Sequence, residues 1–292
     1  MTPSSFVVER APWGLVAARG ADATTFLQNL LSQDLEPLTI GDDAPTLLLT
    51  PQGKLDVACR VVRTDTDEWS LDTDPAFSAR LLASLTRFRI RVHVDLEDRT
   101  ATTALATVVG HDVDAPAGLR ALRTRWGARS GVDLLGPAPL IHDAVTALPA
   151  SVERWDAERF DAFRIESGVP RLGVDVDDST IPQEAFLERD AVSFTKGCFI
   201  GQELVCRIDT RGHVNRYLRR VRIPGPTIPP TGATIVVDGR DRGVLTSAAA
   251  IPGEAGVVGL AMVRREVEPP ASVRVHWDGG DLDAELVAVE EP

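Results

Sequence analysis

The feature that most constrains the fold is a proline- and glycine-rich stretch at residues 224–232, which reads PGPTIPPTG. Proline lacks a backbone N–H, so neither a helix nor a central strand passes through such a stretch. Five short strand-like runs follow it, at residues 234–237, 243–247, 257–263, 273–277 and 284–289. Short strands at such intervals predict a small antiparallel barrel or sandwich. We therefore expect residues 224–292 to form a C-terminal β-barrel domain.

The residues before this stretch mix both kinds of secondary structure. Apolar residues with a period of two predict strands, and those with a period of 3.6 predict helices. Strands are predicted at 14–19, 92–96 and 104–109, helices at 23–32 and 75–85, and a hairpin at 46–50 and 55–63. Such a mixture is typical of an α+β fold.

The charge balance limits the partners. The 292 residues include 31 basic and 43 acidic side chains, for a formal net charge of −12. Nucleic-acid binders normally carry a basic footprint, so we expect no DNA partner and no general phosphate binding. The N-terminus lacks the pattern of a secretory signal, and no apolar run reaches the roughly 18 residues of a membrane span. We therefore expect a cytoplasmic protein with no membrane partner.

The three cysteines are Cys59, Cys198 and Cys206. An odd number without Cys-x-x-Cys spacing argues against a disulfide framework and a self-contained zinc site, so we expect no metal ligands. Cys59 lies in a strand-like run and Cys206 in an apolar run, which predicts that both pack in the core. An iron–sulfur species at Cys198 would need further ligands from a partner or a second copy.

A helix predicted at residues 155–168 places one carboxylate among apolar side chains. At about 100° per residue, Glu166 lies only about 20° from Trp155 around the helix axis. It also lies at the helix C-terminus, where the dipole disfavours negative charge. Burying an unpaired carboxylate is costly, so Glu166 needs a partner. An ion pair with Arg164 or Arg171, fraying into water, or a ligand with N–H donors such as a pterin ring would each satisfy it.

A second element surrounds Cys198 and reads TKGCFIGQE from residue 195 to residue 203. If the following helix begins near Cys198, the free N–H groups of its first turn and the nearby Lys196 both favour the thiolate. A thiolate is a stronger nucleophile and a better ligand for soft metals. The competing interpretation is that Cys198 is a small buried hydrophobe.

A third element is the basic run at residues 211–222, which reads RGHVNRYLRRVR. It is either a local patch for RNA or an acidic ligand, or the solvated face of a strand, and we favour the strand. Trp13, before the first strand, is either a stacking surface or part of the core. The chain has no G-x-G-x-x-G or Walker A pattern, so nucleotide chemistry is unsupported.

Residues 196–203, KGCFIGQE, resemble the signature K-G-C-[YF]-x-G-Q-E of the YgfZ family of folate-binding proteins, which is related to the glycine-cleavage T-protein. Weaker similarities occur in the family's order at residues 20–22, 26–28, 53–54, 164–170 and 181–184. They cover the chain from about Trp13 to Arg220. The octapeptide is highly specific, whereas each of the other matches would be weak alone.

The resemblance implies a ring of three domains around a central channel that holds tetrahydrofolate. The first two would be interleaved α+β domains within residues 1–223, the second lobe covering roughly residues 50–140, and the third would be the barrel. Members of the family support the assembly or repair of iron–sulfur proteins, including radical enzymes that modify tRNA. The implied partners are therefore folate, iron–sulfur client or assembly proteins and, more weakly, tRNA.

The resemblance also implies roles for the residues of the octapeptide. Cys198 matches the family's reactive cysteine, and we expect Lys196 to favour its thiolate. The remaining residues that we assign to the loop and the folate site are Gly197, Gly201, Gln202 and Glu203.

Two aromatic residues of the family contact folate, and by spacing they match Trp13 and Phe160. The second is a tryptophan in the best-known members, so Phe160 keeps the stacking face and loses the indole donor. Glu166 is expected to bind the edge of the pterin ring.

One departure concerns catalysis. The T-protein has an acidic pair on the strand after its turn, and by register this pair falls on Val57 and Ala58. Asp56 shares a strand face with Ala58 and is the candidate for the general base that transfer needs. We therefore favour a tetrahydrofolate-binding accessory protein for iron–sulfur protein assembly or repair. The alternative is a folate-dependent aminomethyltransferase or other one-carbon transferase.

Overall fold

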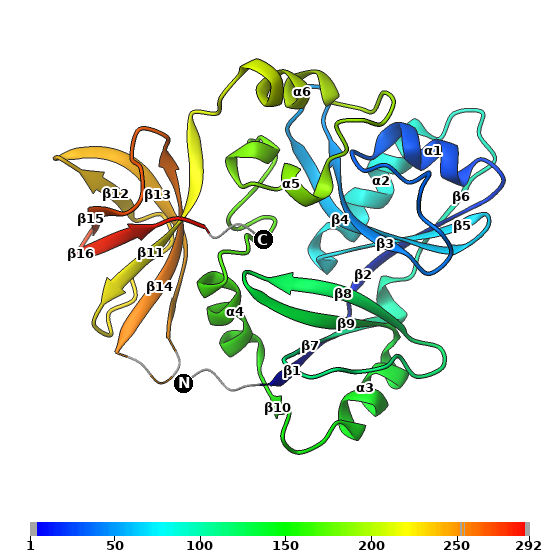
Figure 1. The fold of residues 1–292 in the computed structure, drawn as a ribbon, viewed down its shortest axis with the longest axis horizontal. Helices are drawn as coiled ribbons and strands as arrows, with labels where there is room; N and C mark the ends of the chain where they lie inside the picture. Colours follow the sequence, from blue (N-terminus) through cyan, green and yellow to red (C-terminus); the bar gives the residue numbers. More distant parts are fainter. Residues whose placement is uncertain (1–4, 252, 254, 290–292) are drawn as a thin grey trace.

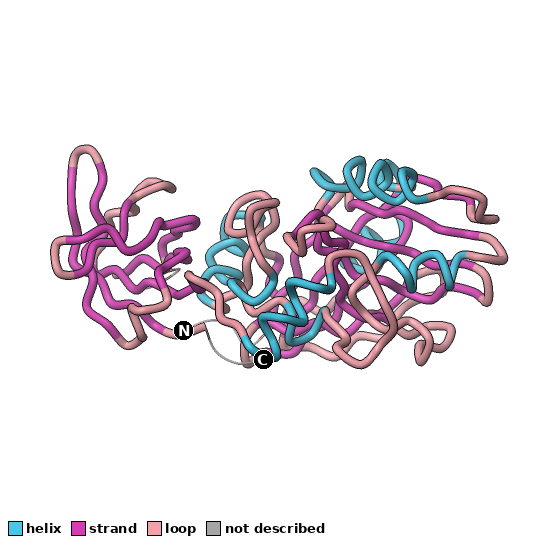
Figure 2. The backbone as a smooth tube through the Cα atoms, turned by 90° about the horizontal axis from the view of Figure 1, so that it is seen from above, coloured by secondary structure: helices cyan, strands magenta, loops and turns pink. Residues whose placement is uncertain are grey.

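The computed structural model describes residues 5–251, 253 and 255–289. Three sheets organise these residues, two of them open and one closed into a barrel (Figure 1). The barrel lies at one end of the molecule, and short helices lie between it and the two open sheets (Figure 2). The expected α+β class with a C-terminal antiparallel barrel is confirmed.

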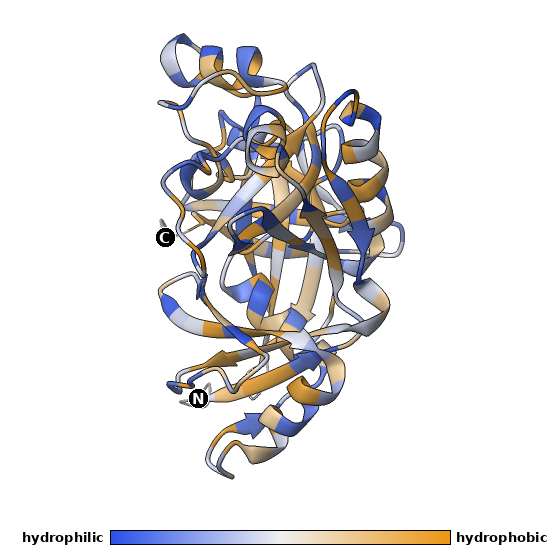
Figure 3. Cartoon of the chain, turned by 90° about the vertical axis from the view of Figure 1, so that its right-hand side faces the viewer, coloured by the Kyte–Doolittle hydropathy of each residue, from blue (hydrophilic) through white to orange (hydrophobic). Residues whose placement is uncertain are grey.

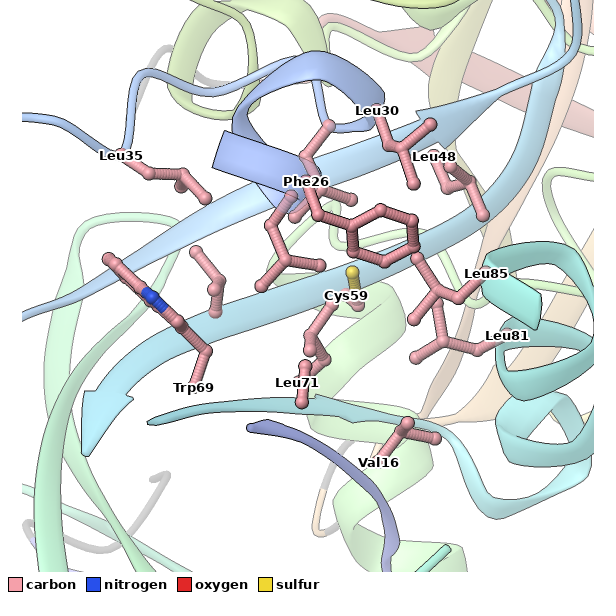
Figure 4. Packing of buried hydrophobic residues seen from close by; sticks show 14 of the residues in the cluster. Val16, Phe26, Leu30, Leu35, Leu48, Cys59, Trp69, Leu71, Leu81 and Leu85 are labelled. Atoms are coloured by element: carbon pink, nitrogen blue, oxygen red, sulfur yellow. The ribbon is translucent and has the colours of Figure 1, made fainter. Parts of the chain in front are cut away.

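The first open sheet has the order β3-β4-β5-β2-β6. Its strands are β2 (Gly14–Arg19), β3 (Asp43–Leu49), β4 (Leu55–Asp65), β5 (Glu68–Thr73) and β6 (Asp95–Asp98). Helices α1 (Ala23–Leu30) and α2 (Ser78–Phe88) pack on one face, and η1 (Pro75–Phe77) leads into α2. Figure 4 shows Phe26 of α1 and Leu81 and Leu85 of α2 directed toward Cys59 and Leu71 of the sheet.

The β3–β4 hairpin forms where the sequence predicts it. The backbone N–H of Gly53 donates to the carbonyl of Thr50 at 2.8 Å, which closes the turn. Along the first part of β4, buried residues alternate with half-buried ones, as expected of a strand with one face in the core. Asp74 caps the next helical segment by accepting from the N–H of Ala76, and Pro75 follows it at the first helical position.

The second open sheet has the order β10-β1-β7-β9-β8. Its strands are β1 (Phe6–Arg10), β7 (Thr103–Val109), β8 (Arg120–Trp126), β9 (Arg129–Pro137) and β10 (Glu153–Arg154), with η2 (Thr100–Thr102) before β7 and α3 (Ala138–Ala147) after β9. Ile141 of α3 packs with Val7 and Leu134 of the sheet. Figure 3 shows the outer helices carrying hydrophilic residues beside hydrophobic ones, as expected of helices with one face on a sheet.

The two open sheets divide the chain differently from the expected lobe at residues 50–140. The first sheet ends at Asp98, and the second combines β1 with residues 103–154. Consecutive strands β1 and β2 therefore lie in different sheets. Local sequence patterns identify strands but do not state which strands pair, so the sequence does not predict this exchange.

The barrel closes in the order β11-β14-β13-β12-β15-β16, with β16 paired to β11. Its strands are β11 (Arg216–Pro224), β12 (Thr234–Val237), β13 (Arg240–Ala250), β14 (Gly256–Arg264), β15 (Ala271–Trp277) and β16 (Gly280–Val287). The barrel includes β11, which begins at Arg216, before the expected boundary at residue 224. The proline- and glycine-rich stretch is a loop within the barrel, and part of the basic run is β11, with Leu218 and Val221 buried.

Four short helical segments connect the sheets to the barrel: α4 (Ala157–Glu166), η3 (Pro182–Glu184), α5 (Glu188–Ala191) and α6 (Gln202–Arg211). The helix predicted at 155–168 is shorter, because Asp156 caps its start and Gly168 takes a φ of +73° after its end. The buried carboxylate of Asp175 ties the barrel to α4. It accepts from Arg164 at 2.7 Å and from the hydroxyls of Thr246 at 2.6 Å and Ser247 at 2.7 Å.

Candidate functional site

Trp13 and Phe160, the two predicted ligand-contacting aromatic residues, line one cavity. Trp13 lies between β1 and β2, and Phe160 lies in α4. The cavity has a volume of about 400 Å³, and its walls come from both open sheets, from α4 and from residues 169–172. Strand β1 belongs to the second open sheet and β2 to the first. Trp13, in the segment that joins them, therefore shares a cavity with α4 only in the folded protein.

A network of charged side chains fixes the cavity wall. Arg60 forms a bidentate pair with Asp72, in which Nε and Nη2 donate to the carboxylate at 2.9 and 3.1 Å. Its Nη1 donates to the carboxylate of Asp133 at 3.0 Å. The indole N–H of Trp13 donates to Asp72 at 3.0 Å. Burial disfavours the Arg60 cation, but the two carboxylates outweigh it and raise the pKa of Arg60. The network therefore holds the Trp13 ring in one orientation.

Arg10, at the end of β1, contacts both aromatic rings. Its guanidinium carbon lies 4.5 Å from the ring centroid of Trp13 and 4.9 Å from that of Phe160. Its Nη2 donates to the hydroxyl of Thr107, which donates to Asp133. Burial lowers the pKa of Arg10. The sequence does not identify Arg10 as a site residue. Its contact with Thr107 forms only when β1 pairs with β7.

Trp126 completes the aromatic wall. It ends the edge strand β8, and its ring meets that of Phe160 edge-on, with centroids 4.9 Å apart and planes at 74°. Trp126 also lines the cavity. No strand is predicted here from the sequence, although the alternation of Leu122, Thr124 and Trp126 with exposed residues indicates one.

Glu166 does not line this cavity. It lines a larger one, of about 1100 Å³, whose other walls come from the barrel. Its backbone carbonyl accepts from Arg220 at 3.0 Å. Arg164 and Arg171, the partners considered for its carboxylate, pair instead with Asp161, at 2.8 and 3.3 Å. Helical periodicity gives the direction of the side chain around α4 but not the element that it meets.

The helix after the octapeptide begins at Gln202 and not near Cys198. Gly201 precedes it with a φ of +79°, a conformation that a helix does not accept. The free N–H groups of the first turn therefore follow Cys198 by several residues, and the expected contact of the thiol with that turn is wrong. Glu203 is exposed in the first turn, where a carboxylate is favoured by the dipole.

Lys196 contacts the end of another helix. Its ammonium donates to the backbone carbonyls of Gln28, Leu31 and Gln33, each at 2.7 Å. These carbonyls lie at and just beyond the C-terminus of α1, where a cation is favoured by the helix dipole. Burial lowers the pKa of Lys196 to about 8. The ammonium also lies 5.4 Å from the ring centroid of Phe199.

Contacts on the other side of Cys198 fix the loop as well. The buried Phe199 donates its backbone N–H to the side-chain oxygen of Gln202 at 3.0 Å. Gly201 packs against the hairpin turn, and a Cβ there would lie 2.5 Å from the carbonyl oxygen of Thr50 and 3.1 Å from the Cα of Gly53. Cys198 itself is exposed. The loop is thus held on both sides of an exposed thiol, so the buried interpretation of Cys198 is wrong.

The other two cysteines differ from Cys198 in exposure. Cys59 is buried under Phe26, as predicted, and burial raises its pKa. Cys206 is half-buried on α6 and not in the core as predicted, because the side chain before it, Val205, faces the core instead. Partial burial and Asp209 raise the pKa of Cys206.

Asp56, the candidate general base, faces α2. Its two carboxylate oxygens accept from Arg80 at 2.6 Å and from the hydroxyl of Ser84 at 2.7 Å. Asp56 is not among the residues that line the aromatic cavity, whereas Ala58 is. Ala58 is one of the two positions matched to the acidic pair of the T-protein. It presents a methyl group to the cavity in place of a carboxylate.

Within the described ranges, no group of three or more histidine, cysteine or acidic side chains is arranged to hold a metal ion. Among the same residues, no helix has the length and apolar character that crossing a bilayer requires.

Known proteins resemble this chain along nearly all of its length. The protein named tRNA-modifying protein YgfZ in Klebsiella pneumoniae is 26% identical, over 94% of this chain and 89% of its own. The mouse protein named iron-sulfur cluster assembly factor IBA57 is 28% identical, over 94% of this chain and 80% of its own. The chain is a homologue of YgfZ and IBA57. No family model matches the sequence.

The fold of this YgfZ and IBA57 homologue is that of the T-protein. The crystal structure of the glycine cleavage aminomethyltransferase T from Bartonella henselae superposes with a TM-score of 0.84, over 98% of this chain and 86% of that one, at 18% identity. At this identity the similarity establishes the fold alone. The expected similarity to YgfZ and the expected T-protein fold are confirmed.

Proposed function

We propose that this chain is a tetrahydrofolate-binding accessory protein for the assembly or repair of iron–sulfur proteins, with radical enzymes that modify tRNA among its clients. The names of its homologues support this, since one is called a tRNA-modifying protein and another an iron–sulfur cluster assembly factor. Cys198 is the reactive group in this proposal. Folate is the resident ligand, and iron–sulfur proteins are the partners.

The exposure of Cys198 carries the proposal. Its neighbours Lys196, Phe199 and Gly201 each make contacts that fix the loop, whereas Cys198 is exposed to solvent. A cysteine kept for packing would be buried. A thiol presented by a fixed loop can attack a partner or ligate its iron with little ordering cost. The octapeptide thus forms a fixed loop that exposes the sulfur atom of Cys198 to solvent.

The aromatic cavity suits a flat ligand. Its volume of about 400 Å³ lies within the range of small-molecule sites, which is about 300–1,000 Å³. Trp13, Phe160 and Trp126 provide ring surfaces for stacking, and the paired charges of Arg60 and Asp72 keep the wall rigid. When bound, tetrahydrofolate supplies a carrier for one-carbon units. This chain's residues hold the ring and exclude water from it.

The geometry around Asp56 argues against the transferase alternative. Aminomethyl transfer needs a general base beside the folate. Asp56 is bound to Arg80 and Ser84 and faces α2, and Ala58 lines the cavity with a methyl group. We therefore expect no formation of methylene-tetrahydrofolate from an aminomethyl donor.

Calorimetric titration with tetrahydrofolate tests the ligand. We expect saturable binding at sub-millimolar concentration that Trp13→Leu weakens, with unfolding curves run on both proteins to show that they are folded. Absence of binding by the wild-type chain would remove folate from the proposal.

Complementation tests the thiol. In bacteria that lack their own homologue, the wild-type gene should restore the activity of iron–sulfur enzymes and Cys198→Ser should not. Cys206→Ser is the matched control and should restore it. Equal rescue by Cys198→Ser would exclude the thiol from the function.

A further inference from the structure

Two buried N–H donors of the aromatic cavity have no acceptor. They are Nε of Arg10 and Nε1 of Trp126, which bind no acceptor anywhere in the described part of the chain. Both residues line the cavity and lie against the ring of Phe160. The distance to the Phe160 ring centroid is 4.9 Å from the guanidinium carbon of Arg10 and 4.9 Å from the ring centroid of Trp126. Unsatisfied buried donors are uncommon in folded proteins, and where they line a cavity a bound molecule can supply the acceptor.

Other charged and polar side chains of this wall are paired within the protein. Arg60 and the indole of Trp13 donate to carboxylates. The carboxylates of Asp72, Asp133 and Asp161 accept from arginines. What remains beside Phe160 is therefore an excess of donors, and a ligand that fits has to present acceptors there.

We infer that the cavity selects its ligand by an oxo group in the plane of a heterocycle, which Arg10 Nε and Trp126 Nε1 bind. This rests on the proposed function, for which the group is the 4-oxo oxygen of the pterin. A carbonyl oxygen has two lone pairs and can accept from two donors at once. This assignment differs from the expected role of Glu166, whose carboxylate would accept from the N–H groups of the pterin ring. Glu166 lines the other cavity.

The chemistry predicts a specific discrimination. A 4-amino group in place of the oxo oxygen brings N–H donors toward N–H donors. The two protein donors then stay unsatisfied, and the ligand's donors lose water without gaining a partner. Folic acid and aminopterin differ at this position in the required way, because aminopterin carries the 4-amino group. Their affinities can be compared directly.

The experiment is a calorimetric titration of both compounds into the wild-type chain and into Trp126→Phe. The substitution keeps an aromatic ring at this position and removes the indole N–H together with one of the two fused rings. We expect the wild type to prefer folic acid by at least about tenfold, and Trp126→Phe to reduce that preference to about threefold or less, mainly by weakening folic acid. Trp277→Phe, in the barrel, is the matched control and should keep the full preference.

Arg10→Lys is the second variant. It keeps a cation near the rings and removes Nε, so it should also lower the preference for folic acid over aminopterin. Unfolding curves will show whether each variant is folded. Equal affinity of the wild type for the two compounds, or an unchanged preference in both variants, would overturn this inference while leaving folate binding intact. Failure of the wild type to bind either folic acid or tetrahydrofolate would overturn the folate proposal itself.

Discussion

The ammonium nitrogen of Lys196 lies 2.7 Å from the backbone carbonyl oxygen of Leu31, the C-cap residue of α1. The same nitrogen reaches the carbonyls of Gln28 and Gln33 at the same distance. One side chain thus satisfies three carbonyl oxygens at a helix C-terminus, where the dipole favours a cation. Lys196 therefore positions the octapeptide by joining it to the first sheet's domain, whereas the sequence suggests that it acts on the thiol.

Removal of this ammonium should destabilise the protein. Lys196→Met leaves three carbonyls without their charged donor, and we expect the free energy of unfolding to fall by about 2–4 kcal/mol. Urea denaturation followed by circular dichroism measures the change. Lys54→Met, at the only other lysine of the chain and exposed in the hairpin turn, is the matched control and should change it by less than about 0.5 kcal/mol. A similar small effect for Lys196→Met would contradict the anchoring role.

Lys196 should also give stability a specific pH dependence. Its pKa is lowered to about 8 in the folded protein from the ordinary 10.5, because of burial. Between these values the unfolded chain binds more protons than the folded one, so the contribution of this group to stability rises with pH. The difference in unfolding free energy between wild type and Lys196→Met should therefore grow from pH 8 to pH 10. A constant difference would show that the group titrates alike in both states.

The two glycines of the octapeptide should differ in their tolerance of a methyl group. A Cβ on Gly201 would lie 2.5 Å from the carbonyl oxygen of Thr50, and the φ of +79° adds strain. A Cβ on Gly197 would meet no described atom within 4 Å. We expect Gly201→Ala to cost about 2 kcal/mol or more and Gly197→Ala to stay within about 0.5 kcal/mol. Thermal unfolding of the two variants side by side decides the point, and similar losses would count against the packing described for Gly201.

The three thiols should react in order of exposure. In the native protein a maleimide reagent should modify Cys198 first, since that side chain is exposed. Cys206 should follow slowly, because partial burial and Asp209 raise its pKa, and Cys59 should react only after unfolding. Peptide mass mapping at successive times measures the order, with Cys198→Ser to assign the fast phase. Modification of Cys206 before Cys198 would contradict the presentation of Cys198 by the loop.

Several local features follow from the sequence alone. The hairpin around Pro51 and Gly53, the helix capped by Asp74 and the later barrel strands lie where turn residues and periodicity predict them. The octapeptide by itself indicates the relationship to YgfZ. These predictions succeed because they depend on neighbouring residues, whose spacing is written in the chain.

Only the tertiary structure decides how the site is assembled. Lys196 contacts a carbonyl 168 positions earlier, Trp13 meets Phe160, and Arg10 and Trp126 join them through strands of a sheet that the sequence does not reveal. The same structure places Glu166 in a different cavity. Periodicity fixes which way a side chain leaves its own helix or strand, whereas strand pairing and helix docking fix what it meets. That second choice depends on burial and hydrogen bonding summed over the whole fold.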